Sequence, residues 1–171
     1  MRQSAAYINL EIYEEGVRRL GIASVKLPDI TYPVVTIAGA GMMGNIEVPL
    51  YGMVDTMTAE ITWLEPTGDA VVLASPEKHQ IECRVASEKW EVEAAEVAVQ
   101  ADRYVMIVQP KTFAPGNIAP MGSADTNTQY AVYYFAGYKD NVLIWEIDKR
   151  NMKCVINGTD YMAPVKVALG M

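Results

Sequence analysis

Cysteine and histidine are scarce in this chain of 171 residues, which has two cysteines and one histidine. Cys83 and Cys154 lie far apart and belong to no CxxC or Cys/His cluster. We expect both to be reduced, packed thiols, because they form neither a redox motif nor, with a single histidine, a convincing set of zinc ligands. His79 occurs without a GxSxG or HExxH motif, so we expect a surface or helix-capping residue rather than a catalytic one.

Basic residues are also in deficit, with 14 lysines and arginines against 21 acidic residues and a formal net charge of −7. This balance argues against a protein that grips phosphates, which needs a basic face. It does not exclude a surface past which nucleic acid slides. No stretch approaches the roughly 20 apolar residues of a membrane span, and Met1–Tyr7 has no apolar core of a signal peptide. We therefore expect the chain to fold in the cytoplasm.

Apolar residues are plentiful, at 51% of the chain. A chain of this length suits one domain, residues 1–171, and can bury roughly 70% of the surface that its unfolded form exposes. No internal repeat or linker divides the sequence. Intrinsic disorder is therefore not expected.

Apolar and polar residues alternate with a period of two along much of the chain, which is typical of half-buried strands. Met57, Ala59, Ile61 and Trp63, for example, alternate with polar residues. The expected strands are Ile8–Ile12, Arg19–Leu27, Tyr32–Ala38, Asn45–Leu50, Met57–Trp63, Gln80–Ser87, Val92–Gln100, Tyr104–Gln109, Thr128–Tyr138, Val142–Asp148 and Met152–Ile156. The sequence predicts a mainly β, single-domain barrel or sandwich.

Other segments are expected to be turns, loops or helix. Gly68–Ser75 is the one short helix expected, and Pro76 ends it. Alanines weaken the alternation of apolar and polar residues after Glu91, so residues 91–96 are expected to be either strand or a helical turn. The segment Lys111–Asn127 reads as a long connection, and Pro164 is expected to limit regular structure before a short tail, residues 164–171. Tight turns are expected at Glu14-Glu15-Gly16, at Lys139-Asp140-Asn141 and at Asn157-Gly158.

A glycine motif is the strongest sign of an enzyme in this sequence. Gly39-Ala40-Gly41-Met42-Met43-Gly44 matches GxGxxG, follows a β-branched run, and has Glu65 about 20 residues further on, as a dinucleotide site requires. However, the last glycine must open a helix whose N–H groups hold the pyrophosphate. Here Pro49 and Gly52 break a helix. We therefore expect a glycine-rich loop, residues 37–46, and no NAD or other cofactor.

Tyrosines and carboxylates allow two further hypotheses. Tyr130, Tyr133 and Tyr134 lie on one expected strand, where aromatics either stack on bases or, more commonly, pack as core and cross-strand partners. Scattered carboxylates can form a general acid/base pair, but no spacing selects one.

Two blocks of the sequence resemble phage major tail tube proteins. The C-terminal block is Trp145–Met152 followed by Val155–Asp160. The N-terminal block comprises Leu27–Ile30, Gly39–Gly44, Val48–Leu50, Gly52 and Met57–Trp63, in the order found in that family. The resemblance covers nearly the whole chain, although residues 66–104 are similar only in length and strand character.

The resemblance implies a structural, non-enzymatic subunit without catalytic residues. Such subunits form hexameric rings whose strands join into one inner barrel, and the rings stack into a tube inside a contractile sheath. The implied partners are further copies of the chain, the tail sheath protein, baseplate or spike proteins and a tape-measure protein. DNA fills the lumen only in a phage, whereas an R-type bacteriocin carries none. The protein would be made in the bacterial cytoplasm and end in a virion tail or a released tail-like particle.

Two groups of residues are the candidate sites. The expected contact between rings comprises Gly39, Gly41, Met42, Met43 and Gly44. The expected lumen-facing residues are Glu60, Glu82, Glu91 and Glu93, because acidic walls repel phosphates and do not hold them. Alternatively, these glutamates are solvated on the outside of the tube, where they meet the sheath. The competing hypothesis for the whole protein is a small monomeric β-barrel that binds a ligand in its own interior.

Overall fold

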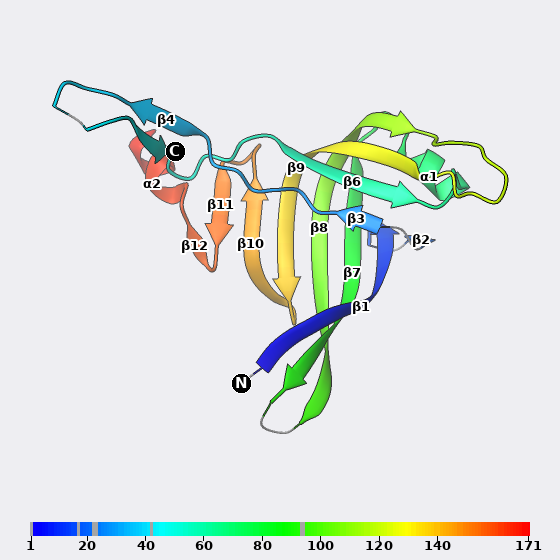
Figure 1. Ribbon diagram of the computed structural model, residues 1–171. Helices are drawn as coiled ribbons and strands as arrows, with labels where there is room; N and C mark the ends of the chain where they lie inside the picture. The colour runs from blue at the N-terminus through cyan, green and yellow to red at the C-terminus, as the bar shows by residue number, and fades with distance from the viewer. Residues whose placement is uncertain (1, 17, 22–23, 42, 93–94) are drawn as a thin grey trace.

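The computed structural model describes residues 2–16, 18–21, 24–41, 43–92 and 95–171, which form β-strands and two short helices (Figure 1). The strands are β1 (Arg2–Glu14), β2 (Arg18–Gly21), β3 (Ser24–Lys26), β4 (Val34–Ile37), β5 (Ile46–Pro49), β6 (Met57–Trp63), β7 (His79–Glu91), β8 (Glu96–Ala114), β9 (Thr126–Lys139), β10 (Val142–Asp148), β11 (Lys153–Ile156) and β12 (Thr159–Asp160). The helices are α1 (Gly68–Leu73) and α2 (Ala163–Ala168). The predicted mainly β fold is confirmed.

One large antiparallel sheet dominates the molecule, with the strand order β12-β11-β10-β9-β8-β7-β1-β2. Strand β9 changes its partner along its length: residues 126–132 pair with β6, and residues 134–139 pair with β10. Strand β3 then pairs with the far side of β6. The sheet therefore curls, so that β6 and the start of β9 cross over the top of the upright strands β7 to β10 (Figure 1).

The core fills the space inside this curl. On β6, Met57, Ala59, Ile61 and Trp63 are buried, whereas the residues between them are half-buried. Helix α1 closes one end with Ala70 and Leu73, which are fully buried in the same cluster. Burying a side chain such as leucine contributes about 1.5–3 kcal/mol. Period-two strands and the short helix were predicted correctly here.

The predicted tight turns at Asp140-Asn141 and Asn157-Gly158 are confirmed. All four of these residues have positive φ, at 47°, 62°, 49° and 82° in chain order. Lys139 pairs with Val142 across the first turn, and Ile156 pairs with Thr159 across the second. Two consecutive positive φ values twist a hairpin to match its strands, and Asn, Asp and Gly adopt them most easily.

Strand boundaries in the middle of the chain differ from expectation. The strands expected at Val92–Gln100 and Tyr104–Gln109 are one strand, β8, and Glu91 pairs with Glu96 at the hairpin end. β8 runs on through Pro110 to Ala114. Pro110 lies beyond the start of β7, which is opposite Val108, and its pairing with β9 shifts register between Pro110 and Thr112, as is usual for a proline in a sheet. The connection expected over 111–127 is therefore shorter.

The C-terminal tail is helical, contrary to the expectation that Pro164 would limit regular structure. Helix α2 begins at Ala163, so the proline occupies its first turn. A proline is tolerated there because the first N–H groups of a helix have no partner within the helix. The expectation treated the proline as a helix breaker when its position is that of a helix start.

Candidate assembly surfaces

Strands β4 and β5 form a separate two-stranded sheet, which projects with its connecting loop from the upper left of the body (Figure 1). We call residues 34–49 the arm. Every residue of its two strands is exposed. The large apolar side chains among them are Val34, Val35, Ile37, Ile46 and Val48. A lone hairpin is marginally stable in water, and a contiguous exposed apolar patch marks an interaction surface.

The tip of the arm holds the glycine-rich loop that sequence analysis selected. Gly41 and Gly44 have φ values of 91° and 132°, and no atom lies near the position of an added Cβ at either residue. Met43 is fully exposed. Gly39 is also exposed, and Met42 lies outside the described residues. Strand β5 follows Gly44, as expected, where a dinucleotide fingerprint requires a helix.

The root of the arm is held against the C-terminal part of the chain. A Cβ at Gly52 would lie 2.7 Å from the sulfur of Met162, so only glycine fits at this close approach. The rings of Tyr51 and Tyr161 meet edge to face at 5.8 Å between centroids. Lys149 donates a hydrogen bond to the carbonyl oxygen of Asp55. These contacts fix where the arm leaves the body.

A second group of exposed apolar side chains comes from the loop that connects β8 to β9 and from the residue after β6. Ile118 and Met121 of the connecting loop are fully exposed, and Leu64, at the end of β6, is mostly exposed. Sequence analysis assigned this segment no site. The signal available was a run rich in proline and glycine that nevertheless carries large apolar residues.

The face of the main sheet opposite the core, which we call the polar face, carries charged side chains, although Val105 and Ile107 of β8 lie on it as well. Arg84 on β7 donates from Nε to Oε1 of Glu82 at 2.6 Å, and its guanidinium lies 4.2 Å from the ring centroid of Tyr13 on β1. Arg103 on β8 is directly opposite Arg84 and lies over the ring of Tyr138 on β9. Opposed like charges repel, and the carboxylate and the two rings offset this.

The polar face continues over β10 and β11. Lys153 forms an ion pair with Glu146 at 2.6 Å. Tyr134 donates to the same carboxylate at 3.1 Å, and its pKa is raised by burial and by the negative charge of Glu146. The described part of this face therefore carries mixed, partnered charges rather than a basic stripe.

The three candidate lumen residues that the structure describes, Glu60, Glu82 and Glu91, lie at different places in the sheet. Glu82 lies on the polar face of β7, where it is buried and forms an ion pair with Arg84. Glu60 lies on the polar face of β6, half-buried, and accepts from Nε2 of Gln129 at 2.8 Å. Strands β8 and β9 separate the two glutamates in the sheet. Glu91 is half-buried at the end of β7, and Glu93 lies outside the described residues.

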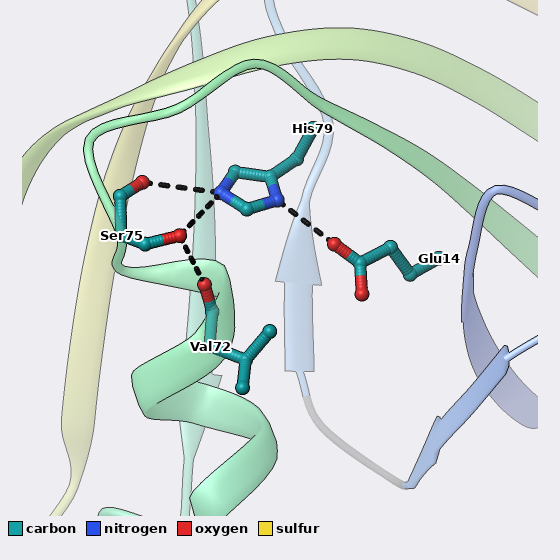
Figure 2. A network of polar contacts seen from close by, with 4 residues as sticks. All are labelled: Glu14, Val72, Ser75 and His79. Carbon is teal, nitrogen blue, oxygen red and sulfur yellow. Dashed lines mark hydrogen bonds and ion pairs between the residues drawn. The ribbon is translucent and has the colours of Figure 1, made fainter.

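His79 forms the polar network of Figure 2. Its Nδ1 lies 2.9 Å from Oε1 of Glu14, and its Nε2 lies 3.2 Å from Oγ and 3.1 Å from the carbonyl oxygen of Ser75. This order resembles a Ser-His-acid triad. However, Ser75 Oγ already donates to the carbonyl oxygen of Val72 at 2.7 Å, so it can only accept from His79.

A carbonyl oxygen only accepts, so Nε2 of His79 donates to that of Ser75 and is not free to take a proton from Ser75 Oγ. Through Ser75, one residue beyond the C-cap Ala74 of α1, the histidine links the segment after the helix to Glu14 on β1. Ser75 is not a residue of the helix, so the capping role stays a prediction, and the expected surface position is wrong, because His79 is only 5% exposed.

Both cysteines are free and buried. Burial, with the adjacent Glu82 charge, raises the pKa of Cys83 to about 12. Within the described residues, no group of three His, Cys, Asp or Glu side chains is close enough to hold a metal ion. The same residues include no helix that is long and apolar enough to span a membrane.

Comparison with known proteins identifies a family and a fold. The family model described as phage tail tube protein FII matches residues 6–170. No curated protein matches the chain. A solved chain from the extracellular contractile injection system PVC, in its sheath/tube terminator in the extended state, aligns with a TM-score of 0.53 at 12% identity, over 78% of this chain and 96% of that one.

A chain of the sheath-tube complex of the same system aligns with a TM-score of 0.46 at 12% identity, over 77% of this chain and 86% of that one. At 12% identity, the terminator chain demonstrates a shared fold only. The family match is a match of sequence and demonstrates membership of the family. It extends over nearly the whole sequence, including the arm, the curled sheet and α2. The chain therefore belongs to the phage tail tube protein FII family and is a tail tube subunit.

Proposed function

We propose that this tail tube subunit forms hexameric rings that stack into the hollow inner tube of a contractile phage tail or a phage-tail-like bacteriocin. The observation that carries the proposal is an open edge of the main sheet. β1 pairs with β7 along its length, but with β2 only at residues 12–14. Among the described strands, none pairs with the other side of residues 2–11.

The opposite edge of the same sheet is also short of partners, since β12 has two residues. An open edge invites pairing with another chain, and joining such edges around a ring removes them. Because the two edges differ, the contact is heterologous and closes only as a ring. A monomeric β-barrel with an interior ligand has less support, because buried side chains fill the space inside the curl.

The polar face of the main sheet would then line the lumen. Glu60 and Glu82 lie on faces opposite the core, and Glu91 is the last residue of β7. Glu93 is proposed to line the lumen with them. Without a basic stripe, this wall would let DNA in a phage, or a tape-measure protein, pass without binding. A cryo-EM map with both Glu60 and Glu82 directed away from the channel, and a basic wall, would contradict this assignment.

The exposed tip of the arm, including Gly39, Gly41, Met42, Met43 and Gly44, would form a contact between rings. Ordering glycines has an entropic cost, and burying methionine offsets it. The outer surface would meet the tail sheath protein, and the tube ends would meet baseplate or spike proteins. We further propose synthesis in the bacterial cytoplasm and a final place in a virion tail or a released particle.

Electron microscopy of the purified protein tests the ring. At high concentration, negative stain should reveal hollow tubes of uniform diameter, and Ile8→Lys should abolish them. Ile8 is exposed on β1, and a charge at an open edge discourages pairing. The matched control is Val92→Lys, at an exposed valine of the β7–β8 turn, which should still assemble. A protein that stays monomeric by ultracentrifugation at all concentrations refutes the proposal.

A further inference from the structure

Two exposed surfaces rich in apolar side chains lie at opposite ends of the subunit. The arm projects at the upper left of Figure 1, and the loop between β8 and β9 extends at the right, beside α1. We call Pro115–Asp125 the 115–125 loop. Residues 34–46 include no charged residue, and neither do residues 112–124, in a chain that is 20% charged. The uncharged run of each surface ends at Glu47 on the arm and at Asp125 on the loop, and Glu65 lies beside the loop.

The 115–125 loop is anchored at its base. The N–H of Ala124 donates to the carbonyl oxygen of Leu64 at 2.9 Å, and Thr126 Oγ1 donates to the carbonyl oxygen of Pro115 at 2.8 Å. Gly116 has a φ of 92°, and a Cβ there would lie 1.8 Å from the carbonyl oxygen of Ala124. The chain thus closes back on itself tightly at the base of the loop.

This anchored base leaves apolar side chains exposed around an open depression. Ile118 and Met121 are fully exposed and Leu64 is mostly exposed. The depression, of about 720 Å³, lies between the loop and residues 63–67. A surface that is held in place and apolar can receive a partner at low cost in conformational entropy.

We propose that the arm of one subunit docks on the 115–125 loop surface of a second copy. This inference rests on the proposed tube, and it names the surface that receives the arm. Donor and receptor are different parts of the chain, so the contact is head-to-tail and can repeat from subunit to subunit. Contact between the two surfaces would bury Met43 and the arm valines against Leu64, Ile118 and Met121, whereas Glu47 of the arm and Glu65 of the depression would have to stay at its solvated rim.

Cross-linking between engineered cysteines tests the contact. The double variant Met43→Cys/Met121→Cys is assembled and treated with a bis-maleimide that has a flexible spacer. The native Cys83 and Cys154 are buried, so the unmodified protein is the background control. We expect a ladder of covalent oligomers beyond the dimer on a denaturing gel. Because the proposed contact joins rings, the ladder should pass six subunits, and a ladder that stops at six contradicts that placement.

Single-cysteine variants separate this contact from a symmetric one. Met43→Cys alone and Met121→Cys alone should stay uncross-linked, whereas dimers from Met43→Cys alone would mean arm against arm and overturn the inference. Tubes of the double variant without cross-links overturn the inference but leave the proposed tube intact. Failure of the unmodified protein to form any tube overturns both.

A charge pair gives an independent readout if the cysteine variants assemble poorly. Met43→Glu and Met121→Lys should each reduce tube formation at least tenfold, and combining both substitutions in one chain should restore it at low salt. Restoration requires that the two positions meet in the assembly. A double variant that assembles no better than the single variants contradicts the contact.

Discussion

Strand β6 and the arm are both rich in apolar and β-branched residues, yet β6 is buried and the arm is exposed. β6 lies between β3 and β9, and its apolar residues face the core. The strands of the arm pair only with each other, so both of their faces meet solvent. Burial here depends on which strands are available as neighbours. The arm is the region whose missing neighbour would come from another chain.

Matched substitutions of isoleucine test this comparison most directly. Ile61→Ala in β6 should lower the free energy of unfolding by about 2–5 kcal/mol, because it removes a fully buried side chain and leaves a cavity. Ile37→Ala in the arm should change it by less than about 0.5 kcal/mol. Urea titrations of the dissociated subunit provide the measurement. Similar losses in the two variants would mean that the arm packs on its own body.

The sequence predicted β6, α1 and the tight turns because each depends on local patterns. Alternation defines β6, and the Asp140-Asn141 pair adopts the positive φ values that its turn requires. Strand β8 is one strand where two were predicted, and Asp102 and Arg103 lie in the predicted gap. In the structure Asp102 accepts from Ser87, and Arg103 lies over a tyrosine ring. Those partners come from other strands, so no local pattern reveals them.

The exposed position of the arm could not be predicted either. Val34, Val35 and Ile37 match the pattern of a buried strand, and only the absence of an overlying layer leaves them exposed. The glycine loop at the tip was identified, because its composition is local. The 115–125 loop was missed as a candidate site, because a run with proline and glycine predicts a connection and says nothing about which side chains it displays.

A substitution of His79 tests whether folding and assembly depend on different parts of the subunit. His79→Ala removes the contacts with Glu14 and with the carbonyl oxygen of Ser75, which should cost about 1–3 kcal/mol of stability. Tube formation below the unfolding transition should persist, because no part of this network belongs to the arm or to the open edge of β1. Ser75→Ala, which keeps the bond to Glu14, should cost less. Lost assembly in a folded His79→Ala subunit would contradict the separation of folding from assembly.

The smallest expected effect concerns Asp148, in the turn whose Lys149 contacts the root of the arm. Burial opposes ionisation of Asp148, but hydrogen bonds from Asn151 and from the Arg150 N–H outweigh it and lower its pKa below the ordinary value. A carboxyl group whose pKa falls on folding stabilises the folded state above its unfolded pKa, and this contribution is lost as the pH falls. Asp148→Ala should therefore lower the urea midpoint slightly at pH 7, and less below about pH 4. An equal loss at both pH values would mean that the turn depends on packing and not on the carboxylate charge, and the anchor of the arm would then be insensitive to acid.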